Sequence, residues 1–168
     1  MRFGRIRCAL GCTALALVLT AAAPDAPSKP RQITGNHAFL FNSVTGGWSP
    51  DVTGGAVDLG NVGASPHHSS SSLLVVDVDA GGGPAFGENA KVRLTAVRGA
   101  SLINSRKLAP RTVIDAEQRV YGDVAHPVSH LGFWLPENGC GTITLTAILT
   151  ADGRTYTRKG LFGFVCSE

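Results

Sequence analysis

The sequence predicts an all-β fold, a single antiparallel β-sandwich of seven to nine short strands. Runs of alternating apolar and polar residues recur along the chain, and glycine, proline, asparagine and aspartate separate them. Only residues 115–120 give any hint of a helix, and that stretch is short. Strand spacing does not distinguish two packed sheets from one rolled sheet, so a small β-barrel is the alternative.

An export signal is predicted at the N-terminus. Three arginines in the first seven residues precede an uncharged, mostly apolar run over 8–23. This run has 16 residues, fewer than the roughly 20 that a membrane-spanning helix needs. We therefore predict a signal peptide over 1–22, cut after Ala22, with no stable membrane insertion afterwards. The mature protein is then secreted or periplasmic.

The alternative for the N-terminus is a lipoprotein. Leu10-Gly11-Cys12 matches a lipidation box in outline. However, the apolar core lies after Cys12, whereas a lipidated cysteine should follow that core. The signal peptide is therefore the preferred interpretation.

Removal of the signal peptide changes the charge balance. The mature chain keeps 12 Lys+Arg and 12 Asp+Glu, so the positive charge of the full chain belongs to the signal. Composition thus gives no support for a nucleic-acid partner. About 146 residues remain, enough for one hydrophobic core. We predict a Pro/Ala-rich linker over 23–35 and one β-sandwich domain over 36–168.

The first half of the domain contains two strand candidates. In 37–44 two phenylalanines share one face, and the residues between them share the other. The segment 46–50 is a turn by composition, and a short strand is expected over 56–59. The serine-rich segment 64–72 is predicted to be a polar loop.

The strongest strands follow. The segment 72–79 begins as an apolar run and then alternates, with Asp77 and Asp79 on the solvent face. The segment 90–97 alternates cleanly and is expected to pair with it in antiparallel fashion. Another strong strand is expected over 128–135. Weaker strands are expected at 101–107, 112–116 and 119–121.

A hairpin closes the chain. Asp152-Gly153 between two β-rich runs predicts a two-residue type I′ turn, which needs φ > 0 at both positions. If Ala151 faces Arg154, the register brings Cys140 opposite Val165. The predicted inward residues are Ile143, Leu145, Ala147 and Leu149, and the predicted outward residues are Thr142, Thr144 and Thr146.

A disulfide between Cys140 and Cys166 is predicted at the open end of this hairpin. The signal peptide removes the other two cysteines, and an exported protein matures in an oxidising compartment. The bridge would close a loop of 27 residues. Closing such a loop contributes roughly 3 to 4 kcal/mol in the chain-entropy model.

At the level of architecture, the short strands and their punctuation resemble the immunoglobulin-like class. The resemblance implies two packed antiparallel sheets. The cysteines differ from those of antibody domains, because Cys140 and Cys166 join one hairpin and do not connect two sheets across the core.

Two metal sites are conceivable from the sequence, although a cofactor-free module is preferred. His67, His68, His126 and His130 could together hold copper or zinc. In extended chain, His126 and His130 would be about 13 Å apart, so both could bind one ion only if Pro127 makes a turn. Asp77, Asp79 and Glu88 carry hard oxygen ligands that suit calcium. Surface histidines and a solvent-facing strand end are the simpler explanations.

The tryptophans are candidate partner contacts. Trp48 lies in a predicted turn, and Trp134 faces away from the core if Phe133 is buried. Exposed tryptophan commonly anchors a protein or carbohydrate partner.

No catalytic motif is evident. The sequence has no G-x-S-x-G elbow and no phosphate-binding loop. We therefore expect an exported, non-enzymatic binding or structural module. The alternatives are a periplasmic metal-binding protein and a hydrolase whose residues come from loops.

Overall fold

The computed structural model describes residues 29–58, 69, 71–83, 85–103, 106–122 and 125–165. The predicted signal peptide lies outside these residues, as do His67, His68 and Cys166. Within the described part, no helix is long and apolar enough to cross a membrane.

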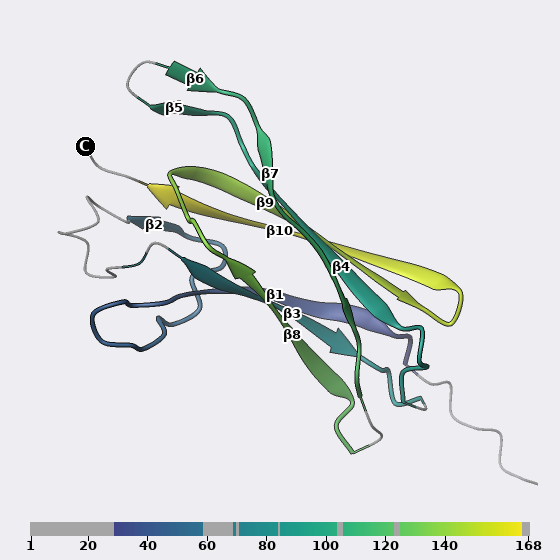
Figure 1. The fold of residues 1–168 in the computed structure, drawn as a ribbon. Helices are drawn as coiled ribbons and strands as arrows, with labels where there is room; N and C mark the ends of the chain where they lie inside the picture. The colour runs from purple at the N-terminus through teal and green to yellow at the C-terminus, as the bar shows by residue number, and fades with distance from the viewer. Residues whose placement is uncertain are drawn as a thin grey trace, which may run out of the picture.

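Seven antiparallel strands form two sheets that face each other, as expected for a β-sandwich and not for one closed barrel (Figure 1). The three-stranded sheet has the order β1-β3-β8, and the larger sheet has the order β10-β9-β4-β7. The strands are β1 (Gln32–Leu40), β3 (Ser72–Asp79), β4 (Lys91–Arg98), β7 (Arg111–Arg119), β8 (Val128–Leu135), β9 (Gly141–Ala151) and β10 (Arg154–Val165).

Three short strands complete the described structure. β2 (Ala56–Asp58) adds to the edge of the larger sheet and runs parallel to β10. β5 (Ser101–Ile103) and β6 (Arg106–Leu108) pair as a two-stranded arm between β4 and β7. This arm projects beyond the sandwich at the top of Figure 1.

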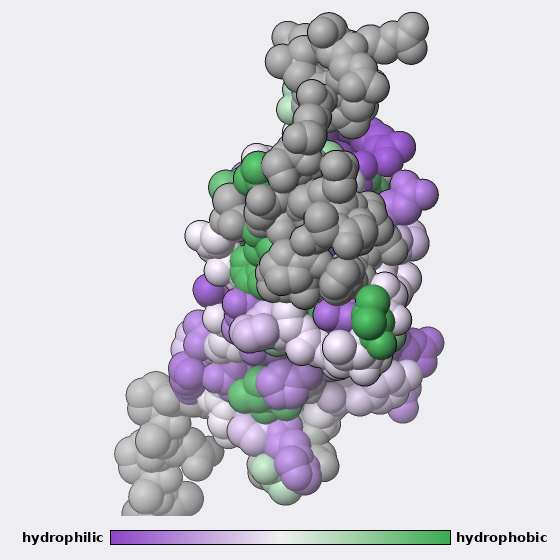
Figure 2. Space-filling model, turned by 90° about the vertical axis from the view of Figure 1, so that its left-hand side faces the viewer, coloured by the Kyte–Doolittle hydropathy of each residue, from purple (hydrophilic) through white to green (hydrophobic). Residues whose placement is uncertain are grey.

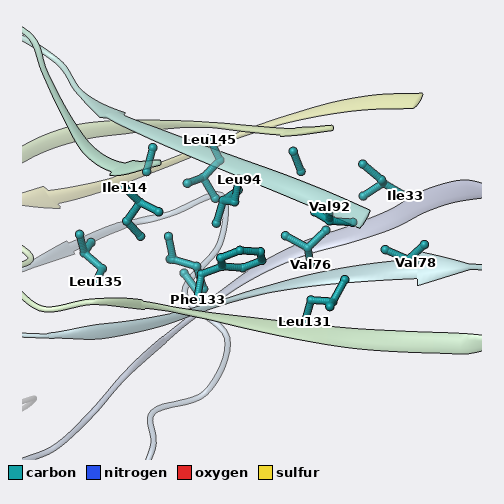
Figure 3. Packing of buried hydrophobic residues seen from close by; sticks show 14 of the residues in the cluster. Ile33, Val76, Val78, Val92, Leu94, Ile114, Leu131, Phe133, Leu135 and Leu145 are labelled. Carbon is teal, nitrogen blue, oxygen red and sulfur yellow. The ribbon is translucent and has the colours of Figure 1, made fainter. Parts of the chain in front are cut away.

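The core lies between the two sheets, and the predicted alternation of buried residues is confirmed. In β8, Leu131, Phe133 and Leu135 point inward, and in β3 the buried residues likewise occur at every second position. Side chains from both layers meet in this space (Figure 3). The other members of the core come mainly from β4 and β9: Val92, Leu94, Ala96, Ile143, Leu145, Ala147 and Leu149.

The predicted pairing of 72–79 with 90–97 was wrong, because β3 and β4 lie in different sheets. Two strand predictions were also wrong in their bounds. β1 begins at Gln32, inside the segment 23–35 predicted as linker, and it ends at Leu40. Its first half is rich in polar residues and glycine, and the register shifts between Ile33 and Gly35. Such an irregularity hides the alternation on which the prediction depends.

β7 replaces the hint of helix at 115–120 and joins two of the weaker strands into one. Its outward carboxylates pair with cations of the neighbouring strand: Arg93 lies 2.7 Å from Asp115, and Lys91 lies 3.1 Å from Glu117. Opposite charges across two strands stabilise the pairing of residues that have low β-propensity.

The β9–β10 hairpin has the predicted turn and register. Asp152 and Gly153 have φ values of 51° and 69°, as a type I′ turn requires. Ala151 pairs with Arg154, and the pairing continues without a shift to Gly141 and Phe164. The next pair in this register is Cys140 with Val165, the last described residue. Because Cys166 lies beyond it, the disulfide stays a prediction.

A buried arginine and a buried serine connect the β8–β9 loop to the two sheets. Arg98, at the end of β4, donates to the carbonyl oxygens of Glu137 and Asn138 at 2.7 and 2.5 Å. Ser72, at the start of β3, donates to the side-chain oxygen of Asn138. Gly139 has a φ of 57°, and the Arg98 guanidinium occupies the space that a side chain there would need. Glycine is therefore needed at position 139 if Arg98 is to keep its contacts with Glu137 and Asn138.

We expect Cys140→Ser to lower the free energy of unfolding by about 2–4 kcal/mol, because it would remove a cross-link from the unfolded chain. Urea denaturation of Cys140→Ser, Cys166→Ser and the double variant under oxidising conditions measures this. If the two residues are bonded, the double variant is no less stable than either single variant. Additive losses would contradict the pairing.

Candidate functional site

The outer face of the three-stranded sheet carries the chemically distinctive side chains. Register places them in rows across β1, β3 and β8. One row contains Phe39, Leu73 and Trp134. A second row contains Asp77 and His130, and the row between the two contains Gly132 of β8. Adjacent rows are about 7 Å apart along the strands, so apolar and ionisable residues share one small surface.

Three aromatic rings form a cluster at the apolar end of this face. We call Phe41, Trp48 and Trp134 the aromatic cluster. Trp48 contacts Phe41 and Trp134 edge-on, with ring centroids 5.2 and 6.0 Å apart, and Phe41 lies 6.4 Å from Trp134. Each tryptophan remains 49% exposed. The structure thus brings together both residues that were predicted as partner contacts.

Exposed hydrophobic residues do not form one continuous patch on the face shown in Figure 2, which looks at the molecule from the left of Figure 1. They stand as separate groups among polar residues. Phe133 is 2% exposed, so its neighbour Trp134 faces outward, as predicted.

A loop that follows β1 positions Trp48. It turns back and runs along the free edge of β1, where the Ser49 and Val52 N–H groups donate to the carbonyl oxygens of Leu40 and Ala38 at 2.9 Å. In return, side-chain oxygens accept from β1: Ser49 Oγ from Leu40 N–H and Thr53 Oγ1 from Ala38 N–H, both at 2.9 Å. The loop therefore satisfies an edge that would otherwise be unpaired.

Four ionisable side chains form a continuous chain beside the cluster. We call Asp51, His37, Asp77 and His130 the His–Asp chain. His37 Nδ1 lies 2.6 Å from Asp51 Oδ2, and His37 Nε2 lies 3.0 Å from Asp77 Oδ2. His130 Nδ1 lies 2.7 Å from Asp77 Oδ1. The chain thus runs from the loop through β1 and β3 to β8.

Gly35 leaves room for the centre of this chain. A Cβ at that position would collide with His37 Nε2 and would lie 3.0 Å from Asp77 Oδ2. Any larger residue at position 35 would therefore displace the contact between His37 and Asp77.

Electrostatics favour the charged forms at the loop end of the chain. The hydrogen bond to Asp51 raises the pKa of His37 above its usual value; partial burial opposes this, and the negative charge of Asp77 adds to it. Burial alone would raise the pKa of Asp51, but hydrogen bonds from Thr53, His37 and the Ala38 N–H hold that pKa well below its usual range.

A cleft of about 750 Å³ adjoins the other end of the His–Asp chain. His130 forms part of its wall, and Asp77 holds His130 Nδ1, so the tautomer that donates to Asp77 leaves Nε2 as an acceptor. His126, Glu88 and Arg119 also line the cleft. Ser129 lines it too, but its hydroxyl donates to the Tyr121 carbonyl at 2.5 Å. The described residues of the cleft therefore contain no serine activated by a histidine.

The predicted metal ligands are only partly brought together. His126 and His130 share the cleft, whereas His67 and His68 lie outside the described residues. Among the side chains that the structure describes, no three His, Cys, Asp or Glu form a group that could hold a metal ion.

The predicted calcium ligands Asp77, Asp79 and Glu88 are described by the structure, and they form no group that could hold a metal ion. Asp77 contacts two imidazoles, and Asp79 contacts Lys29 Nζ at 2.8 Å and the Gly81 N–H at 2.8 Å. These contacts lower the pKa of Asp79, the Lys29 ammonium most of all. The two aspartates thus already have hydrogen-bond partners within the protein.

Sequence reasoning missed His37 and Asp51. They are 14 residues apart and belong to a strand and a loop, so no local motif connects them. The alternation of 37–44 places His37 on the same face as Phe39, and this is the one signal that pointed outward.

No protein-family model matches this chain, and neither does any curated protein.

Proposed function

We propose that this chain is an exported, non-enzymatic β-sandwich module that binds a partner through the aromatic cluster. The observation that carries the proposal is the packing of Phe41, Trp48 and Trp134 into one cluster while both indoles stay 49% exposed. Tryptophan is enriched among the residues that dominate binding energy. Single exposed apolar side chains are ordinary on a protein surface, whereas exposed aromatic rings that contact one another mark a contact surface.

The location of the cluster supports the same function. It lies on a sheet face, where β1, β3 and β8 hold Trp134 rigidly, and the loop along β1 holds Trp48 against it. A prearranged surface loses little entropy when a partner binds. The partner is a protein or a carbohydrate, since both are recognised by indole rings.

Export and fold class belong to the same proposal. The predicted signal peptide over 1–22 supports secretion or a periplasmic location. Counted in chain order, the first, second and fifth antiparallel strands share one sheet, and the other four share the second. Immunoglobulin constant domains differ only in placing the fourth strand on the first sheet. This order supports an immunoglobulin-like module.

A second candidate function, metal binding, is favoured by one observation. His126 and His130 line the same cleft, and Asp77 holds the Nδ1 atom of His130. Histidine ligands of metals commonly donate their other ring N–H to a carboxylate in this way. His67 and His68 would complete the set.

We expect Trp134→Ala and Trp48→Ala each to weaken partner binding by about 2 kcal/mol or more, roughly thirtyfold in Kd, since both remove a central indole. The experiment is a quantitative pull-down with the mature domain, one arm using envelope extract and medium of the producing cell, and the other using insoluble cell-wall polysaccharide. Leu161→Ala is the matched control, because Leu161 is 57% exposed on the other sheet. Partners that both tryptophan variants retain at the wild-type level would refute the proposal.

If the second candidate is correct, calorimetric titration with zinc or copper gives saturable binding near micromolar. Binding then falls in the His126→Gln/His130→Gln variant and stays unchanged in Leu161→Ala, because Leu161 lies on the other sheet and belongs to no proposed ligand set. The His67→Gln/His68→Gln variant tests the other pair. A wild-type titration without saturable binding would exclude this function.

A further inference from the structure

His37 contacts a carboxylate with each of its ring nitrogens. Ionised carboxylates only accept hydrogen bonds, and neutral imidazole carries one N–H. The two contacts, at 2.6 Å to Asp51 and 3.0 Å to Asp77, are therefore both hydrogen bonds only when His37 is an imidazolium. Loss of one proton leaves a nitrogen lone pair facing a carboxylate oxygen, whichever tautomer remains.

Asp51 transmits this change to the loop that carries Trp48. Its Oδ1 accepts from the Thr53 N–H and hydroxyl at 2.9 and 2.6 Å and from the Ala38 N–H at 3.2 Å, while its Oδ2 accepts from His37. Asp51 is thus both part of the loop and the end of the His–Asp chain. Trp48 lies three residues before it.

The other end of the His–Asp chain lies on the strand that carries Trp134. His130 and Trp134 are both on β8, and His130 donates to Asp77 Oδ1. The side-chain links from loop to β8 therefore lie in series, through Asp51, His37, Asp77 and His130. Breaking either contact of His37 interrupts this side-chain connection between the loop and β8, while the hydrogen bonds of the loop to β1 and the contact between the two indoles remain.

The charged groups that face His37 act in one direction. Asp51 faces it from the loop, and Asp77 faces it from β3; along β1 its neighbour on this face is Phe39, with ring centroids 6.4 Å apart. His130 on β8 reaches it only through Asp77. Lys29 is paired with Asp79. Among the residues that the structure describes, His37 thus contacts two carboxylates and no cation, and this favours the imidazolium form.

We propose that the His–Asp chain makes ligand binding by the aromatic cluster pH-dependent: protonated His37 links the loop of Trp48 to the strand of Trp134 through side chains, and its deprotonation loosens the loop. This regulation rests on the proposed function of the cluster. Its structural step, however, takes place without a ligand. The two ideas can therefore fail separately.

The direction with pH follows from the raised pKa of His37. A histidine whose pKa is higher in the folded than in the unfolded chain adds stability below the ordinary pKa of about 6.5. That contribution disappears as the pH rises through the raised value. The loop is thus tied at mildly acidic pH and loosened at alkaline pH.

Intrinsic fluorescence tests the step directly, because the chain has only two tryptophans and both belong to the cluster. With the mature wild-type domain and no ligand, emission is expected to move to longer wavelength and acrylamide quenching to increase as the pH rises from 5 to 9, with a midpoint above 6.5. His37→Gln should abolish this transition. His126→Gln should retain the transition, because His126 is not part of the His–Asp chain.

Nitrogen NMR of the wild-type imidazoles gives a second readout that does not require a variant to fold. A His37 ring with both nitrogens protonated at pH 6.5 supports the switch. A neutral His37 at that pH, a wild-type emission that does not change with pH, or an unchanged transition in His37→Gln overturns it. None of these results affects the proposed binding function, which depends on the Trp48→Ala and Trp134→Ala pull-downs.

Discussion

The packing of two sheets against each other is the constraint on which the rest of this structure depends. Every second residue of the long strands must enter the space between the layers, and in β3 and β8 those places are filled by aliphatic side chains, Phe133 and, at one end of each strand, Ser72 and Ser129. Because side chains alternate, the remaining residues of the same strands must face outward. The core thus determines that Asp77, His130 and Trp134 share one outer surface, although none of them contributes to the core.

That outer surface is organised by contacts that are far apart in sequence. His37 and Asp77 are 40 residues apart, and Asp77 and His130 are 53 apart, yet register brings all three into hydrogen-bond distance. Hydrogen bonds to an ionised carboxylate are roughly twice as strong as those between neutral groups, so the His–Asp chain adds order to a face that water also reaches. The absence of a side chain at Gly35 is as important to it as the ionisable groups.

Sequence was sufficient where a structural rule is local. The turn at Asp152-Gly153, the register of β9 with β10 and the exact bounds of β3 and β8 follow from turn chemistry and from a period of two. Sequence was not sufficient where a strand depends on contacts with a neighbouring strand: β1 contains a register shift, and β7 depends on ion pairs with β4. The aromatic cluster could be predicted only in part. The exposure of Trp134 followed from alternation, but its contact with Trp48 depends on how a loop folds back.

The loop that folds back along β1 also has a protective role. It supplies oxygen acceptors to the N–H groups of Ala38 and Leu40, which otherwise point away from the sheet with no strand beside them. An exposed strand edge is a template for the backbone of another chain. Displacement of this loop would therefore leave two adjacent donors on a long strand next to exposed indoles. By occupying this edge, the loop blocks the pairing of β1 with a strand of another chain.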